Sequence, residues 1–306
     1  MIKSKSFKYR KKSDMVVEVV IVLLLAFIAI ITIYPFLNVL ALSFNDASDS
    51  VKGGITIFPR RFTMNNYAKV MSYPSLINGA VISVLRTVIG AGLSVLCTSI
   101  MAYTLSRKDF MARKFFNILF MATMYISGGM VPGYLLMRNL HLFDSFLVYI
   151  LPGLVGAYYV FLMRSYIEGI PYSLQESAML DGANDIRIFR TIIFPLSKPS
   201  IATITLFYAV NQWNSWFDTY LYNSADVRLT TLQYELQKII QSATAAAASA
   251  KNGSVAGLIE ASKSGAITPQ SIQMAITIVV IVPIILIYPF LQKYFVGGMT
   301  VGAVKG

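Results

Sequence analysis

Residues 171–199 read PYSLQESAMLDGANDIRIFRTIIFPLSKP and lie between two long apolar runs. The stretch is too polar to span a bilayer and too regularly patterned to be a passive linker. Ser173 and Glu176 have the S-x-x-E spacing of a capping box, in which each side chain satisfies a free backbone N–H at a helix start. We therefore expect a helix to begin at Ser173.

A glycine divides the stretch into two predicted helices. Gly182 can end the first helix by adopting a positive φ, and Asn184 or Asp185 can cap the second. The second helix has an apolar stripe with helical spacing, opposite two arginines: Ile186, Phe189 and Ile193, against Arg187 and Arg190. Pro195 ends the pattern. This arrangement predicts a helix–turn–helix on a membrane face. We expect another protein to bind there and to transmit movement to this chain.

Composition places the chain in a membrane. Of its 306 residues 56% are apolar and only 13% are charged, whereas a soluble domain carries about a quarter charged residues. The net charge of +12 does not indicate nucleic acid, because no arginine-rich motif or basic helix with interleaved aromatics occurs. The single Cys97 excludes a disulfide framework, and the lone His141 has no partners at metal-ligand spacing.

We expect an all-α polytopic membrane protein with six transmembrane helices. The basic segment 1–16 precedes a first apolar run that is too long for a signal peptide. The membrane domain, 17–296, has predicted spans at about 17–42, 76–105, 115–136, 145–166, 200–222 and 272–292. Residues 297–306 form a short tail.

Two segments between these spans have distinctive compositions. The alanine-rich loop 223–271 should be partly helical. The third span contains several helix breakers, so we expect its outer half to be broken or kinked; they are Gly128, Gly129, Pro132 and Gly133.

Lysine and arginine predict the orientation. Their density is about twice as high in the N-terminal segment, the tail and the loops on the same side as in the loops on the other side. Both termini and residues 168–199 are therefore expected in the cytoplasm, and 223–271 outside.

Arg86 lies inside the second span, where a charged side chain is costly. It is either a residue of a transport pathway or gate, or a structural contact to another helix or an interface. We favour the structural interpretation.

The motifs resemble those of a known family. The segment ESAMLDGA at 176–183, followed by Ile192, Pro195 and Pro199, is similar to the EAA motif of ABC importer permeases. Further segments resemble the MalG-type permeases of carbohydrate-uptake systems, namely LPGLVGAYYVFLMRSY at 151–166, Trp213-Asn214, and YFVGGMTVGAVKG at 294–306. Ser177 departs from the alanine usual in the family, but it is also small.

The resemblance implies a type I ABC importer permease with a cytoplasmic coupling helix–turn–helix in the EAA loop, 168–199, which contacts ATPase subunits. The coupling residues would be Glu176, Ser177, Ala178, Asp181, Gly182, Ala183 and Pro195. The family assembly has a second permease subunit, usually forming a heterodimer, two ATPase subunits and an extracytoplasmic sugar-binding protein in a bacterial cell membrane.

No P-loop motif occurs in the chain. We therefore expect no enzymatic activity and no bound cofactor or metal, with ATP-Mg held on the partner ATPase subunits.

The fifth span is the most polar, and we expect it to line the pathway. Sugar binding requires hydrogen-bonding groups and aromatic faces, which this span supplies as Asn211, Trp213, Asn214, Trp216 and Asp218, with Gln212 among them. Asn211, Asn214 and Asp218 would share one helix face. Alternatively, these side chains lock helices together, and the other permease holds most of the substrate.

Two other classes compete with this interpretation. A secondary transporter would show inverted repeats or intramembrane carboxylates, and the only acids near spans, Glu18 and Asp218, lie towards span ends. A permease for amino acids or peptides is the nearest alternative within importers.

Overall fold

The computed structural model describes residues 12–251 and 269–303. Within these ranges the regular elements are helices, and one isolated bridge pairs Asn45 with Phe62. The chain divides into two compact units, which we describe separately: 1–70 with 243–278, and 71–242 with 279–306.

The first unit contains α1 (Lys12–Ser43), α2 (Ala47–Ser50) and the start of α3 (Asn65–Met71). The most apolar window of α1 is unburied throughout. A helix of this length rises about 48 Å, more than the roughly 30 Å hydrocarbon core of a bilayer. Its exposed apolar side chains are therefore explained by a lipid or protein environment in the membrane.

The second unit holds most of the helices. They are α4 (Pro74–Ser106), α5 (Arg113–Tyr125), α6 (Met130–Asn139), η1 (Phe146–Tyr149), α7 (Ala157–Glu168), α8 (Ser173–Leu180), α9 (Asp185–Ile188), the π-helical η2 (Phe189–Ile193), α10 (Phe194–Leu196), α11 (Lys198–Asn214), α12 (Phe217–Tyr222), η3 (Val227–Leu229), and parts of α13 (Leu232–Lys251) and α15 (Pro269–Ala303). Helix α13 meets the expectation that 223–271 is partly helical, although 252–268 lie outside the described residues.

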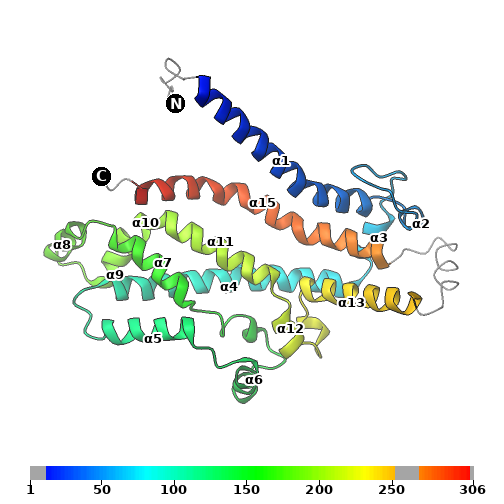
Figure 1. Ribbon diagram of the computed structural model, residues 1–306. Coiled ribbons are helices and arrows are strands. Elements are labelled where there is room, and N and C mark those ends of the chain that lie inside the picture. Colours follow the sequence, from blue (N-terminus) through cyan, green and yellow to red (C-terminus); the bar gives the residue numbers. More distant parts are fainter. Residues whose placement is uncertain (1–11, 252–268, 304–306) are drawn as a thin grey trace. The chain divides into compact units, whose positions relative to one another are not determined.

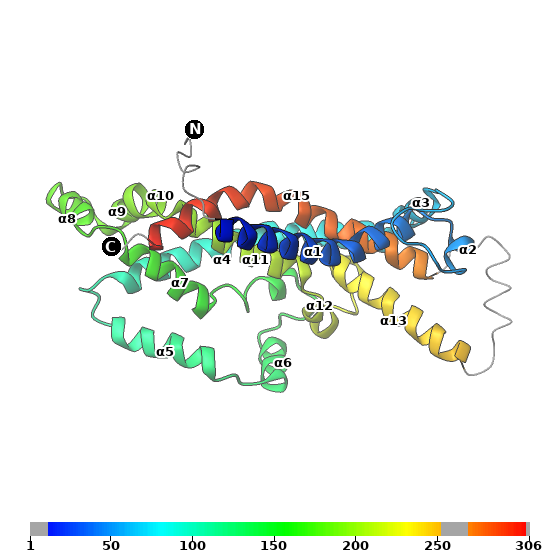
Figure 2. The same cartoon turned by 45° about the horizontal axis from the view of Figure 1, so that its top comes forward.

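The core of this unit lies between α4, α7 and α11, where α11 runs beside α4 in both views (Figures 1 and 2). Fully buried apolar side chains from all three helices meet there, including Ala102, Val160 and Ile204. Tyr208 on α11 hydrogen-bonds the Thr98 hydroxyl at 2.9 Å and accepts from the Gly156 backbone N–H at 3.0 Å. The hydroxyl of Tyr208 thereby satisfies polar groups that would otherwise be unpaired within the core.

Short helices lie at both ends of α11. Helices α8, α9 and α10 lie at its N-terminal end, and α12 lies at its C-terminal end (Figure 1). Helix α11 therefore joins the two regions that the sequence indicates as functional.

Among the described residues, three helices are long and apolar enough to cross a membrane: Met15–Ser43, Pro74–Ser106 and Gln270–Ile287. Two bent pairs raise the number to five, α5 with α6 at 119° and the Asp185–Leu196 segment with α11 at 80°. The α5–α6 bend meets the expected break in the third span, and Gly129 has φ +85° within it. The count of six spans stays a prediction.

The segment 145–166 is not one continuous helix. Helix α7 covers only Ala157–Glu168, which is about 18 Å of rise, and η1 precedes it. Pro152, Gly153 and Gly156 lie between the two helices, where proline and glycine disfavour continuous helix.

The close approach of α4 and α11 depends on Gly90. A Cβ atom there would lie 2.7 Å from Nε2 and 3.0 Å from Cδ of Gln212, a buried side chain held by hydrogen bonds at both polar atoms. In contrast, a Cβ atom at Gly92 in the same helix would meet nothing within 4 Å.

Gly90→Ala is expected to lower the free energy of unfolding by about 1–3 kcal/mol, because Gln212 must move and lose hydrogen bonds. Gly92→Ala is the matched control, and it should raise that free energy by up to about 1 kcal/mol because alanine favours helix. Thermal unfolding of the full chain in detergent measures both. Equal shifts for the two variants would contradict this role of Gly90.

Candidate functional site

The 171–199 stretch forms the predicted pair of helices around a glycine turn. Gly182 has φ +79°, as expected for the residue that ends α8. Asn184 caps α9, with its Oδ1 accepting from the Arg187 backbone N–H at 2.9 Å. Both predictions about this turn are confirmed.

The predicted capping box is wrong. Helix α8 begins at Ser173 as expected, but the cap position belongs to Tyr172, which is in helical conformation and makes no side-chain cap. The chain begins to turn earlier, because the N–H groups of Leu174 and Gln175 donate to the carbonyls of Pro171 and Tyr172. A proline has the φ angle of a first helical turn, so Pro171 starts the turn without a cap at Ser173.

The predicted apolar stripe of the second helix is also wrong in part. Ile186 is 76% exposed, whereas Ile188 and Ile193 are fully buried. The reason is the π-helical turn η2, closed by a bond from the Phe194 N–H to the Phe189 carbonyl. A π turn changes the spacing from i, i+4 to i, i+5, so Ile188 and Ile193 face the same side.

The helix pair has an anchored face and an exposed face. Ala178, Met179 and Ala183 pack against the core cluster that contains Ile188 and Ile193. On the exposed face are two large apolar side chains, Leu180 at 87% and Ile186 at 76% exposure, with polar residues around them: Glu176, Ser177 and Asp181. Pro195 is also exposed.

Arg107 connects the end of α4 to this helix pair. Its guanidinium forms ion pairs with Asp109 at 2.5 Å and with Asp185, the first residue of α9. It also donates to the Tyr103 hydroxyl at 3.2 Å. The hydrogen bond from Arg107 lowers the pKa of Asp109 to about 2, so the pair stays charged at neutral pH. Nothing in the sequence pattern predicts the contact with Asp185.

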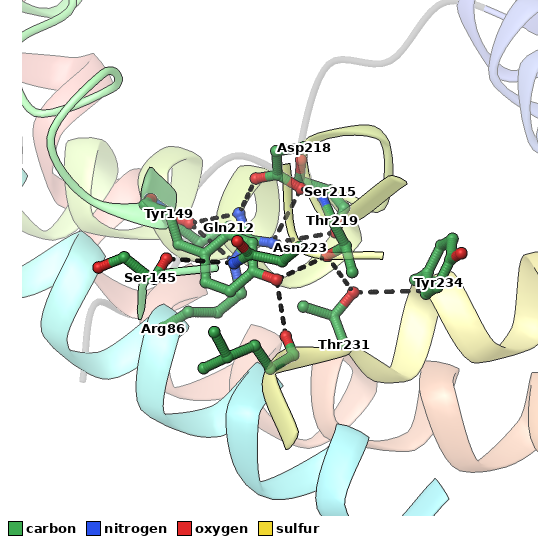
Figure 3. A network of polar contacts seen from close by, with 11 residues as sticks. Arg86, Ser145, Tyr149, Gln212, Ser215, Asp218, Thr219, Asn223, Thr231 and Tyr234 are labelled. Carbon is green, nitrogen blue, oxygen red and sulfur yellow. Dashed lines mark hydrogen bonds and ion pairs between the residues drawn. The ribbon is translucent and has the colours of Figure 1, made fainter. Parts of the chain in front are cut away.

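At the other end of α11, a polar network surrounds Arg86, which is only 2% exposed (Figure 3). Its Nη2 donates to Asp218 at 2.5 Å and to Gln212 Oε1 at 2.9 Å, and its Nε also donates to Gln212. Its guanidinium carbon lies 4.3 Å from the centre of the Tyr149 ring. Arg86 is therefore a structural contact between helices, as the sequence interpretation favoured.

The network includes residues that the sequence did not indicate. Tyr149 donates its hydroxyl proton to the Leu229 carbonyl at 2.6 Å, and its hydroxyl oxygen lies 3.1 Å from the Thr219 hydroxyl, within hydrogen-bonding distance. Thr219 also shares a 3.0 Å hydrogen bond with Thr231. These threonines and Tyr149 have no motif or periodicity that would have marked them, because segments far apart in sequence bring them together.

The expected shared face of Asn211, Asn214 and Asp218 is wrong. Helix α11 ends at Asn214, Ser215 is extended with ψ 126°, and Asp218 belongs to the separate helix α12. The Ser215 carbonyl accepts from Arg86 Nη1 at 3.3 Å. Carbonyls at a helix end lack partners within the helix, and a cation favours that end, so Arg86 stabilises the break.

The other pathway candidates have different surroundings. Trp213 is buried, and its Nε1 donates to the Val280 carbonyl at 3.0 Å. Asn214 is exposed and accepts from Gln233 Nε2 at 3.1 Å. Asn211 is exposed. Trp216 is half-buried, and the centre of its ring lies 5.6 Å from the centre of the Phe217 ring.

Removing either partner of the Arg86–Asp218 pair should destabilise the chain unequally. Asp218→Ala leaves a cation that is 2% exposed without its carboxylate, whereas Arg86→Met leaves a carboxylate that is 22% exposed and reaches water. Breaking a buried pair costs about 3–5 kcal/mol, and the partial exposure of Asp218 reduces the cost for Arg86→Met. We expect the larger loss of thermal stability for Asp218→Ala. The opposite order would contradict the structural role of the pair.

The chain matches no protein-family model. It is nevertheless similar to curated proteins over nearly its whole length. A Bacillus subtilis protein, polygalacturonan/rhamnogalacturonan transport system permease protein YtcP, is 37% identical over 279 residues, covering 91% of this chain and 94% of the relative. Protein LplC of the same organism is 34% identical, covering 97% and 98%.

Further similarities agree with these two. The arabinooligosaccharides transport system permease protein AraQ of Halalkalibacterium halodurans is 30% identical, covering 97% of this chain and all of the relative. A chain in the crystal structure of a bacterial ABC transporter involved in the import of the acidic polysaccharide alginate matches with a TM-score of 0.82 and 28% identity, covering 94% of this chain and 99% of the other. The chain therefore belongs to the family of permease subunits of sugar ABC transport systems.

Proposed function

We propose that this chain forms half of the translocation pathway of an ATP-driven importer for a sugar or oligosaccharide. An extracytoplasmic binding protein delivers the sugar, and separate ATPase subunits that hold ATP-Mg drive the transport cycle. A second permease subunit, forming a heterodimer with this chain, completes the pathway. With six spans, both termini lie on the same side of the membrane as the 171–199 stretch, and the lysine and arginine bias favours the cytoplasm for that side.

One observation carries the coupling role: the α8–α9 pair is anchored on one face and exposes large apolar side chains on the other. Leu180 and Ile186 flank Gly182 on the exposed face. Such side chains at a polar surface favour a protein partner, because burying them at an interface removes apolar area from water. Glu176, Ser177 and Asp181 surround them and provide polar contacts for the ATPase subunit.

The remaining coupling residues act through the anchored face. Ala178 and Ala183 hold the pair against the core, and small side chains permit that close contact. Pro195 lies near the 80° bend between the Asp185–Leu196 segment and α11. A displacement of the turn at Gly182 therefore moves α9, and the π turn η2 connects α9 to α10 and α11.

The far end of α11 is where this movement reaches the pathway. There Arg86 joins α4, α11 and α12, so a shift of α11 changes the position of α12 (Figure 3). Among the pathway candidates, Asn211, Asn214 and Trp216 offer exposed or half-exposed groups for sugar. Trp213 and Asp218 contribute by holding the helices that carry those groups.

The substrate class follows from the relatives. The names of two relatives specify polygalacturonan or rhamnogalacturonan and arabinooligosaccharides. All are carbohydrates, and we propose the same class for this chain.

Leu180→Asp should weaken the interaction with the ATPase subunits without unfolding the chain. The few residues that dominate an interface contribute about 2 kcal/mol or more, and with Leu180 as one of them we expect at least roughly 30-fold weaker retention of the ATPase subunits and loss of uptake. Co-purification and sugar uptake measure the effect.

The matched control is Val227→Asp, because Val227 is an exposed apolar residue at 58% exposure beyond the other end of α11. It should retain the ATPase subunits. Glu176→Lys and Gly182→Arg test the same surface. If Leu180→Asp and both of these variants keep full ATPase binding and uptake, the coupling assignment fails.

Asn211→Ala should raise the KM for uptake without changing thermal stability, because its side chain is exposed and makes no hydrogen bond among the described residues. A single lost hydrogen bond predicts up to about a tenfold increase. Trp213→Phe is the contrasting variant, and it should lower thermal stability because it removes the bond to Val280. An unchanged KM for Asn211→Ala would exclude Asn211 from the pathway.

A further inference from the structure

The second unit has a hollow of about 460 Å³ where α5 begins. Phe110 and Met111 come from the turn before α5, three residues come from its first two turns, and Arg164 comes from α7; the three are Arg113, Lys114 and Asn117. Ile118 completes the lining. The hollow is separate from the helix pair around Gly182 and from the Arg86 network.

The charges of this hollow favour an anion. Arg113, Lys114 and Arg164 contribute three positive charges, and the adjacent Glu168 contributes one negative charge. The N-terminus of α5 adds a partial positive charge from its helix dipole. The balance is therefore positive at the end of an apolar helix.

The two arginines are held in place. Glu168 Oε1 accepts from Arg113 Nη2 at 2.9 Å and from Arg164 Nε at 2.8 Å, while Arg164 Nη1 donates to Asn117 at 2.6 Å. Among the described residues, Arg113 Nη1, Arg164 Nη2 and the exposed Lys114 ammonium make no hydrogen bond. Charged donors with fixed positions and unused N–H groups suit a phosphate group.

The apolar surroundings favour a lipid over a free phosphate. Met111 is 97% exposed at the rim of the hollow, and Ile118 is 59% exposed one turn along α5. The same helix also exposes Phe115, Leu119 and Met121. A ligand that fits both the basic hollow and the apolar surface of α5 has a phosphate group in the hollow and an acyl chain along the helix.

We propose that this hollow binds the headgroup of an anionic phospholipid, with the acyl chain lying along α5. Basic clusters at the ends of membrane helices attract such headgroups, and each cation near the surface contributes roughly a fivefold change in binding. The bound lipid neutralises Lys114 and covers Met111. This proposal rests on the membrane location of the chain and not on the coupling role of α8 and α9.

Lys114→Gln provides the test, because Lys114 has no partner among the described residues and its loss should leave the fold intact. The assembled transporter is purified from vesicles with equal amounts of phosphatidylglycerol and phosphatidylcholine, and the lipids that remain bound are quantified. We expect phosphatidylglycerol to be enriched in the wild type and about fivefold less enriched in Lys114→Gln. Lys114→Glu should reduce the enrichment further.

Lys108→Gln is the matched control, since Lys108 is an exposed lysine in the connection before α5 and does not line the hollow. It should keep the wild-type enrichment. Equal enrichment in Lys114→Gln and Lys108→Gln would overturn the proposal, and so would complete displacement of the lipid by inorganic phosphate.

A further outcome separates lipid from protein. If Lys114→Gln loses ATPase subunits while phosphatidylglycerol stays enriched, the hollow belongs to a protein interface and the lipid assignment is wrong. Leu180→Asp should keep normal lipid enrichment. The lipid site and the coupling surface can therefore fail independently.

Discussion

The hydrogen bonds and ion pair of Arg86 are the interaction on which the second unit depends. A guanidinium with 2% exposure in an apolar helix is costly unless its charge is compensated and its donors are used. Asp218 supplies the charge, Gln212 accepts two bonds, and the Ser215 carbonyl accepts another. Because these partners come from α11, α12 and the break between them, satisfying Arg86 determines where α11 ends and how α12 follows.

Helix α11 links this network to the surface at its other end. The π turn before it places Ile188 and Ile193 on the buried side, and the glycine turn at Gly182 leaves Leu180 on the exposed side. The helix pair therefore has one face packed against the core and one apolar face exposed. Protein interiors are dense and have low compressibility, so a displacement of such an element is transmitted to the core against which it packs. The arrangement fits the coupling role that we propose for this helix pair.

The positive charge of the chain has more than one use. Some basic residues satisfy local acids, as Arg107 does with Asp109 and Asp185. Others, such as Lys114, remain exposed in the first turn of an apolar helix. In a membrane protein, basic residues that pair with acids stabilise the fold, whereas exposed basic residues are available to lipid headgroups.

The sequence by itself determined the membrane class, the helix–glycine–helix of 171–199, the broken third span and the family. Each of these follows from local composition or from a motif with one physical cause, such as the positive φ of Gly182. Tertiary structure decided the register of the apolar stripe, since the core buries Ile188 and Ile193 together across the π turn at 189–193, a spacing that a regular helix does not have. It also decided which polar residues lock helices, because Arg86, Tyr149 and Asp218 meet only after distant segments fold together.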